Sequence, residues 1–185
     1  TSTYNTVHLT RINILTGANS RQHVNPDEGY YWTGATVGDD FVVVPTSSGT
    51  VEMLSKSTGD VLGSVSVGAV VNSTCVLSDD GSHAYLISRD GKLHVLAISD
   101  GDSRYADAAS RITEERVVDL GLTGCACVPT MYDGKLIVGG EVAGGSALAI
   151  IDLAHDFATT LVSSADDAAL PIGGLQGAPL ASVQG

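Results

Sequence analysis

Acidic side chains gather in turns that could supply oxygen ligands to calcium. Asp79 and Asp80 precede Gly81, and the segment 100–102 (Asp-Gly-Asp) begins like the calcium loop of an EF-hand. In the second segment Arg104 occupies the place of a further acidic ligand, and Arg111 occupies the place of the closing glutamate. Because Asp and Gly are also preferred in tight turns, we interpret both segments as hairpin turns and predict no metal site.

The other reactive side chains show no spacing that is typical of catalysis. The sequence contains no HxxxH or HExxH pair, no GxSxG serine and no glycine-rich phosphate-binding pattern. The cysteines include no CxxC pair, so we interpret them as small buried residues: Cys75, Cys125 and Cys127. We interpret the histidines as solvent-facing or strand-packing residues: His8, His23, His83, His94 and His155. We predict no catalytic residue and no cofactor-binding residue.

Charge and composition exclude several classes of partner. The 185 residues carry a formal charge of −12 and include three lysines, while hydrophobic residues make up 43%. This composition is typical of a globular domain, and its acidity opposes binding to nucleic acid or to an anionic lipid surface. No apolar run is long enough to span a membrane, so we predict no membrane insertion.

Short turn signals recur at a fixed distance and indicate the elements that carry these side chains. Thr-Gly or Asp-Gly pairs end in Gly17, Gly59 and Gly101, each 42 residues after the last, and Gly49 and Gly91 are also 42 residues apart. Each of the latter two precedes an alternating apolar run, which is typical of a β-hairpin. The sequence therefore predicts an internal repeat of about 42 residues.

Each repeat is predicted to form four short strands. In the clearest repeat these are Val70–Leu77, His83–Ser88, Lys92–Ile98 and Ile112–Leu120. Such a sheet cannot bury both faces alone, and stacked four-stranded units are the blades of a β-propeller. We therefore predict an all-β propeller segment with blades near 29–68, 69–121 and 122–168 and partial blades at 1–25 and 170–185. A β-sandwich is the alternative, although it gives no reason for strict repetition.

One repeat contains an insertion. From Gly91 to Gly145, taken as the next equivalent glycine, the distance is 54 residues, which places 12 extra residues within the segment 102–116. One or two helical turns around 105–110 or an exposed loop both fit this segment. Loops on rigid scaffolds often carry binding, so it is our candidate interaction loop, although variation in length alone is the alternative. Its candidate residues are Asp102, Arg104, Tyr105, Asp107 and Arg111.

The repeats resemble a known family. Gly49-Thr50-Val51, Gly91-Lys92-Leu93 and the turn at 56–59 (Lys-Ser-Thr-Gly) are similar to the PQQ-like, quinoprotein-type β-propeller repeat. The similarity extends over nearly the whole chain. The family often has a Trp a few residues after Thr-Gly, whereas this chain has Gly63 and Arg21 there. Quinoprotein dehydrogenases also use adjacent cysteines, which the segment 125–127 (Cys-Ala-Cys) does not provide.

The resemblance implies a propeller fold without the enzyme's cofactor residues. We expect a non-catalytic scaffold, secreted or on the cell surface, that binds a protein, a glycan or another ligand. The alternative is a fragment of a PQQ-dependent dehydrogenase whose cofactor site lies outside this segment. Because three blades and two partial blades do not close a ring, we expect a segment of a larger propeller. Self-association or further blades would then cover the open blade faces.

Overall fold

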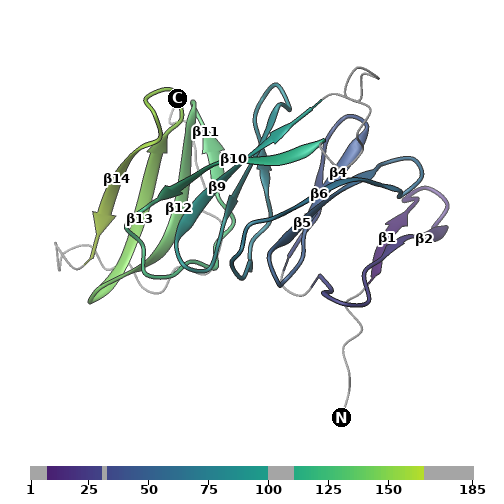
Figure 1. The fold of residues 1–185 in the computed structure, drawn as a ribbon, viewed down its shortest axis with the longest axis horizontal. Coiled ribbons are helices and arrows are strands. Elements are labelled where there is room, and N and C mark those ends of the chain that lie inside the picture. Colours follow the sequence, from purple (N-terminus) through teal and green to yellow (C-terminus); the bar gives the residue numbers. More distant parts are fainter. Residues whose placement is uncertain (1–7, 31–32, 100–110, 165–185) are drawn as a thin grey trace, which may run out of the picture.

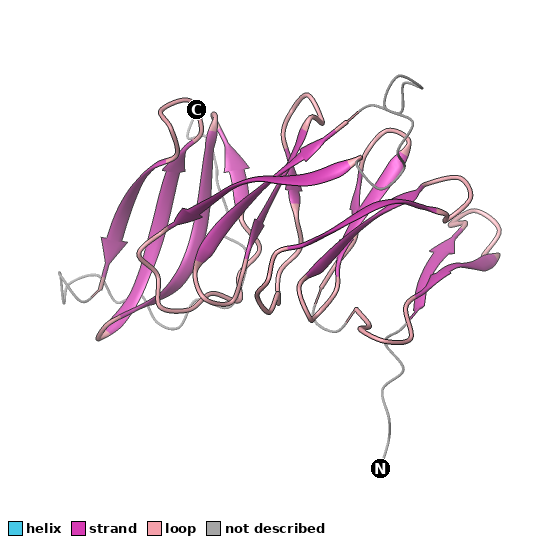
Figure 2. Ribbon diagram, in the orientation of Figure 1, coloured by secondary structure: helices cyan, strands magenta, loops and turns pink. Residues whose placement is uncertain are grey.

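The computed structural model describes residues 8–30, 33–99 and 111–164, and these residues form strands, turns and loops without a helix (Figure 2). Among them, no helix has the length and apolar character needed to cross a membrane. The strands form one two-stranded sheet and three four-stranded sheets. The prediction of an all-β fold with four-stranded antiparallel blades is confirmed.

The four sheets follow one another along the chain. The two-stranded sheet contains β1 (His8–Ile12) and β2 (Asn19–Val24). The first blade contains β3 (Thr36–Val37), β4 (Phe41–Pro45), β5 (Thr50–Ser55) and β6 (Val61–Ser66). The second contains β7 (Val76–Leu77), β8 (His83–Ile87), β9 (Lys92–Ile98) and β10 (Ile112–Asp119). The third contains β11 (Thr130–Tyr132), β12 (Lys135–Val142), β13 (Gly145–Asp152) and β14 (Ala158–Ser163).

Each blade is a simple meander in which every strand pairs antiparallel with its neighbour in the chain. The sheets stand side by side in chain order, from β1 and β2 to β14 (Figure 1). Because side chains alternate between the two faces of a strand, the middle strands of a blade can bury apolar residues on both sides. The middle strands β4, β5, β8 and β9 are accordingly apolar in nearly continuous runs.

Two apolar cores hold the blades together. The core between the first and second blades includes Val43 and Met53 from one side and Leu86 and Leu96 from the other, all fully buried. The core between the second and third blades joins Tyr85, Leu93 and Val95 to Leu136, Val138 and Ile151. Burying one such side chain stabilises the fold by roughly 1.5–3 kcal/mol, so blade stacking is the main source of stability.

Glycines in two equivalent hairpins permit this close stacking. Gly49 and Gly91 follow β4 and β8 with φ of 100° and 82°, a conformation that favours glycine. Each also lies directly against the backbone at the start of the next blade, Gly49 against Ala69 and Gly91 against Leu122. The repeat of 42 residues thus preserves both a turn and a contact between blades.

Two local expectations need correction. Only Val76–Leu77 of the predicted strand Val70–Leu77 pairs with β8. Nearer the start of the predicted strand, the Ser73 hydroxyl donates to the Ile87 carbonyl, and the Arg89 amide donates to the Val70 carbonyl, so no regular ladder forms there. In the third blade the glycine with a positive φ is Gly144, within the two-residue turn between β12 and β13. The spacing from Gly91 to the equivalent glycine is therefore 53 residues and not the predicted 54. The strand predicted over Ile112–Leu120 is confirmed as β10, which ends one residue earlier, at Asp119.

Candidate functional site: an acidic cleft between two blades

A cleft of about 880 Å³ lies where the first and second blades meet. Its walls are the turn after β3, the turn after β7, and the residues that follow β9 and precede β10. Each turn carries two successive aspartates, and the repeat places the turns at the same end of neighbouring blades. Four carboxylates therefore line one opening: Asp39, Asp40, Asp79 and Asp80.

The turn after β7 uses one of these carboxylates for its own structure. Asp80 Oδ1 accepts hydrogen bonds from the Ser78 hydroxyl at 2.6 Å, the Ser82 amide at 3.0 Å and the Ser82 hydroxyl at 2.7 Å. These hydrogen bonds, of which the one from Ser78 has the largest effect, hold the pKa of Asp80 far below its usual value. Asp80 thus stays negative while it shapes the turn, and Asp39 and Asp79 remain exposed beside it.

Arg111 is the cationic side chain of the cleft wall. Its guanidinium lies 3.4 Å from Asp40 Oδ2 and donates through Nε to the Ser99 carbonyl at 3.2 Å. The Ser99 amide in turn donates to the Arg111 carbonyl at 2.9 Å. Residues 99 and 111 are therefore paired in the cleft wall, at the two ends of the segment 100–110.

The structure places one of the five candidate interaction residues. Arg111 lines the cleft, although its side chain is 11% exposed, so it contributes more to the wall than to the surface. The other four candidates, Asp102, Arg104, Tyr105 and Asp107, lie outside the described residues. Ser99 and Arg111, which flank these four candidates in the sequence, line the acidic cleft.

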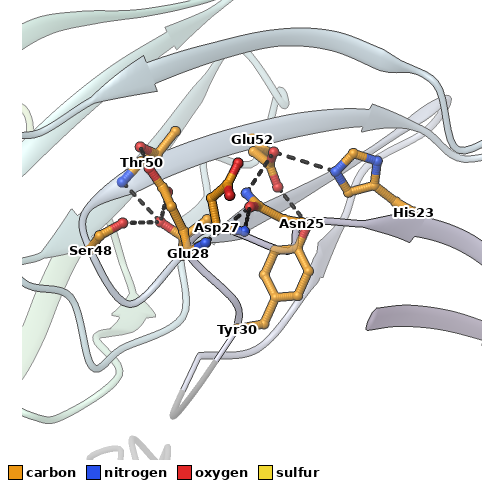
Figure 3. Close-up of polar contacts among 9 residues, drawn as sticks. His23, Asn25, Asp27, Glu28, Tyr30, Ser48, Thr50 and Glu52 are labelled. Carbon is orange, nitrogen blue, oxygen red and sulfur yellow. Dashed lines mark hydrogen bonds and ion pairs between the residues drawn. The ribbon is translucent and has the colours of Figure 1, made fainter. Parts of the chain in front are cut away.

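A second polar cluster joins the two-stranded sheet to the first blade (Figure 3). Glu52 on β5 is largely buried and accepts hydrogen bonds from Tyr30 at 2.5 Å and Asn25 at 3.2 Å, while His23 Nε2 lies 3.4 Å away. Burial has the largest effect on the pKa of Tyr30 and raises it, and the hydrogen bond from Tyr30 to the Glu52 carboxylate raises it further. Because all three partners come from residues 23–30, the cluster fixes this segment on the blade.

Glu28 closes the same cluster over the hairpin between β4 and β5. Its carboxylate accepts hydrogen bonds from the Thr46 hydroxyl at 2.6 Å and the Thr50 hydroxyl at 3.0 Å. Burial opposes ionisation of Glu28, but these bonds and a further one from Ser48 outweigh it and lower its pKa (Figure 3). The carboxylate thus caps a turn, with its oxygens occupied by hydroxyl donors.

A serine, a histidine and a glutamate align in the second blade as they do in many hydrolases. His94 Nε2 lies 2.8 Å from Ser88 Oγ, and His94 Nδ1 lies 2.7 Å from Glu114 Oε1. However, Ser88 is fully buried and His94 is 2% exposed, and the Ser88 hydroxyl also lies 2.5 Å from Asp90 Oδ1. No substrate can reach this serine in the structure, so the arrangement holds the hairpin to β10.

Sequence reasoning missed these pairings of histidine with carboxylate. His23, His83 and His94 lie beside Glu52, Glu115 and Glu114, and His155 lies beside Asp152. One signal was visible in the sequence, because Glu52 and His94 are 42 residues apart and occupy the same place in successive blades. All three cysteines are free and buried, and Cys125 and Cys127 lie in the loop before β11.

Comparison with known proteins identifies the fold. BamB from Moraxella catarrhalis matches with a TM-score of 0.60 and 20% identity over 83% of this chain and 42% of its own. Hydrazine synthase from Kuenenia stuttgartiensis matches with a TM-score of 0.66 and 15% identity over 85% of this chain and 44% of its own. Quinohemoprotein alcohol dehydrogenase from Comamonas testosteroni matches with a TM-score of 0.51 and 19% identity over 68% of this chain and 20% of its own.

These likenesses, together with the stacked four-stranded sheets, show a β-propeller fold. The chain spans less than half the length of each of the three structures. No family model matches the chain, and no curated protein matches it.

Proposed function

We propose that the chain is a non-catalytic propeller scaffold that binds a protein partner at the blade end carrying the acidic cleft. The observation behind this proposal is that Ser99 and Arg111, which flank the segment 100–110 in the sequence, are paired in the wall of that cleft. Inserted loops on rigid sheets are frequent binding elements, and the cleft beside this one is large enough to receive side chains.

The charge of the cleft favours a basic partner. Asp39 and Asp79 are exposed, whereas Arg111, the cation of the wall, already lies beside Asp40. A lysine or arginine of the partner would meet a surplus of negative charge here, on a chain whose formal charge is −12. Such complementarity mainly accelerates association and selects the partner, because one exposed ion pair contributes at most about 1 kcal/mol.

The proposal is tested with a lysine-rich decapeptide whose binding is measured at low and high salt. The double substitution Asp39→Asn/Asp79→Asn should weaken binding at low salt severalfold and reduce its salt dependence. The control is Asp27→Asn/Asp60→Asn, which makes the same change in net charge at exposed sites outside the cleft wall. Equal losses in the two variants would show general attraction to an acidic protein and would refute a site in the cleft.

Two further parts of this proposal rest on resemblance and composition. An extracytoplasmic or cell-surface location follows from the similarity to quinoprotein-type repeats and from the acidic, lysine-poor sequence, and fractionation of the source cells tests it. Self-association or packing against further blades would cover the open blade faces. Native mass spectrometry tests this, since complexes in multiples of 18.9 kDa support self-association and a monomer opposes it.

The alternative, a fragment of a PQQ-dependent dehydrogenase, makes a distinct spectroscopic prediction. Its fold-level basis is the likeness to the quinohemoprotein alcohol dehydrogenase. Addition of PQQ and calcium to the full-length protein should then produce a bound quinone chromophore. Failure of the full-length protein to bind PQQ would remove the enzyme alternative and leave the scaffold proposal unaffected.

A further inference from the structure

A second cleft, of about 370 Å³, lies between the second and third blades. It is lined by side chains from β8 and β10 and from the turn between β13 and β14. Those that carry the argument are His83, Tyr85, Glu115, Arg116, Leu153 and Phe157. The volume lies within the range of small-molecule sites, and the lining combines aromatic rings with hydrogen-bonding groups.

The charges around this cleft are balanced in pairs. His83 Nε2 lies 3.1 Å from Glu115 Oε2, and the Arg116 guanidinium is paired with Asp156. The cleft therefore offers donors and acceptors side by side without the surplus of carboxylates found in the acidic cleft. This environment suits a neutral polar ligand better than a charged one, because a charged ligand would have to compete with an existing ion pair.

An aromatic ring is held at the cleft by a strained turn. Phe157 has a φ of 59° and the preceding Asp156 a φ of 55°, which is an unusual conformation for two successive residues with side chains. Arg116 lies 4.9 Å from the centre of the Phe157 ring. Such strain is retained where the surrounding structure enforces it and is concentrated at functional sites. Here the turn holds the Phe157 ring against the Arg116 guanidinium, which lies over one face of the ring.

Tyr85 adds a hydrogen-bond donor to the cleft. The residue is 7% exposed, stacks on His83 with ring centres 6.3 Å apart, and lines the cleft. Among the described residues the buried side-chain polar atom without a hydrogen-bond partner is Ser99 Oγ, so the Tyr85 hydroxyl is open to solvent at the cleft. Burial, Asp80 and Glu115 raise the pKa of Tyr85, so the hydroxyl stays protonated and can donate.

From these four observations we propose that the cleft between the second and third blades binds a neutral saccharide. A pyranose ring presents an array of C–H bonds, which pack on the negative face of an aromatic ring, here the face of Phe157 that Arg116 does not cover. Its hydroxyl groups both donate and accept, so they can pair with the carboxylates and the guanidinium and can accept a hydrogen bond from the Tyr85 hydroxyl. The proposal is independent of the acidic cleft, which lies between the first two blades.

The test is titration with the methyl pyranosides of glucose, galactose, mannose and N-acetylglucosamine, followed by amide NMR shifts. We expect at least one of them to bind at concentrations of about 0.1–10 mM, which is the range for a small ligand making few contacts. Tyr85→Phe retains the ring and should weaken binding by about 3- to 10-fold, the effect of one neutral hydrogen bond. Phe157→Leu retains an apolar side chain and should weaken binding at least as much.

The matched control is Tyr132→Phe, an exposed tyrosine that does not line this cleft. It should bind the sugar as tightly as the parent protein, and thermal melting establishes that all three variants fold. Absence of binding by all four pyranosides would overturn the proposal. So would binding that Tyr85→Phe and Phe157→Leu leave unchanged, or a stronger response to glucosamine or galacturonate than to the neutral sugars.

Discussion

Substituting Gly91 by alanine should destabilise the protein because it separates two blades. Gly91 has a φ of 82°, and a Cβ atom there would lie 2.5 Å from the Leu122 carbonyl oxygen of the next blade. The left-handed conformation costs alanine about 1–2 kcal/mol. Overpacking against the backbone adds about 1–3 kcal/mol, since a carbonyl cannot move aside as a flexible side chain can. We therefore expect a loss of about 2–5 kcal/mol in the free energy of unfolding.

Gly81→Ala separates the two contributions. Gly81 has a similar φ of 70°, but a Cβ atom there would meet nothing within 4 Å, so only the conformational cost applies. Urea unfolding should show a larger fall in midpoint for Gly91→Ala than for Gly81→Ala, with equal slopes. Gly49→Ala, at the equivalent position of the first blade, should behave like Gly91→Ala. Equal losses at Gly81 and Gly91 would refute close stacking of the blades at this hairpin.

Three other properties of the structure give measurable expectations. Glu52→Ala should lower the free energy of unfolding by about 3 kcal/mol, because it removes a buried acceptor of several bonds. In the same urea experiment the control Glu115→Ala, whose side chain is 59% exposed, should cost less than about 1 kcal/mol. Hydrogen bonds, of which the one from His155 has the largest effect, lower the pKa of Asp152 from 3.8 to about 2. The ionised form of Asp152 therefore stabilises the fold above pH 4, and this contribution is lost as the pH falls towards 2. Asp152→Asn should therefore lose less stability over that interval in acid titrations followed by circular dichroism, and an unchanged acid limb would contradict this assignment. Burial raises the pKa of Cys75 to about 12 and that of Cys125 to about 11, so a thiol reagent at pH 8 should label both only after unfolding, and rapid labelling of the native protein would contradict their burial.

The fold was predictable because the repeat encodes turns and blade contacts together. Gly49 and Gly91 were visible as markers at equal spacing, and both occupy the left-handed conformation that hairpins require. The third hairpin was misplaced by one residue because Gly144 and Gly145 are chemically identical, and only the register of β12 with β13 distinguishes them. The strand predicted from Val70 was too long because periodicity reports burial, and Val71, Ser73 and Cys75 are buried without a continuous ladder.

The candidate sites were less predictable because they are formed between blades. Asp39 and Asp79 lie in separate repeats, and they line one cleft only because neighbouring blades present equivalent turns at the same end. The pairing of Arg116 with Phe157 joins two blades, and Phe157 reaches it through a turn whose positive φ values no sequence signal indicated. The repeat in the sequence therefore predicted the blades, whereas the side chains that meet in the clefts between blades could be identified only from the three-dimensional structure.

The most direct test of the scaffold proposal is a map of amide NMR shifts as the lysine-rich peptide is added to the labelled protein. We expect the shifts to concentrate at residues 38–40, 78–82, 98–99 and 111, which line the acidic cleft. Shifts spread evenly over the exposed aspartates, or concentrated at a surface away from these turns, would contradict the assignment of the cleft as the binding site.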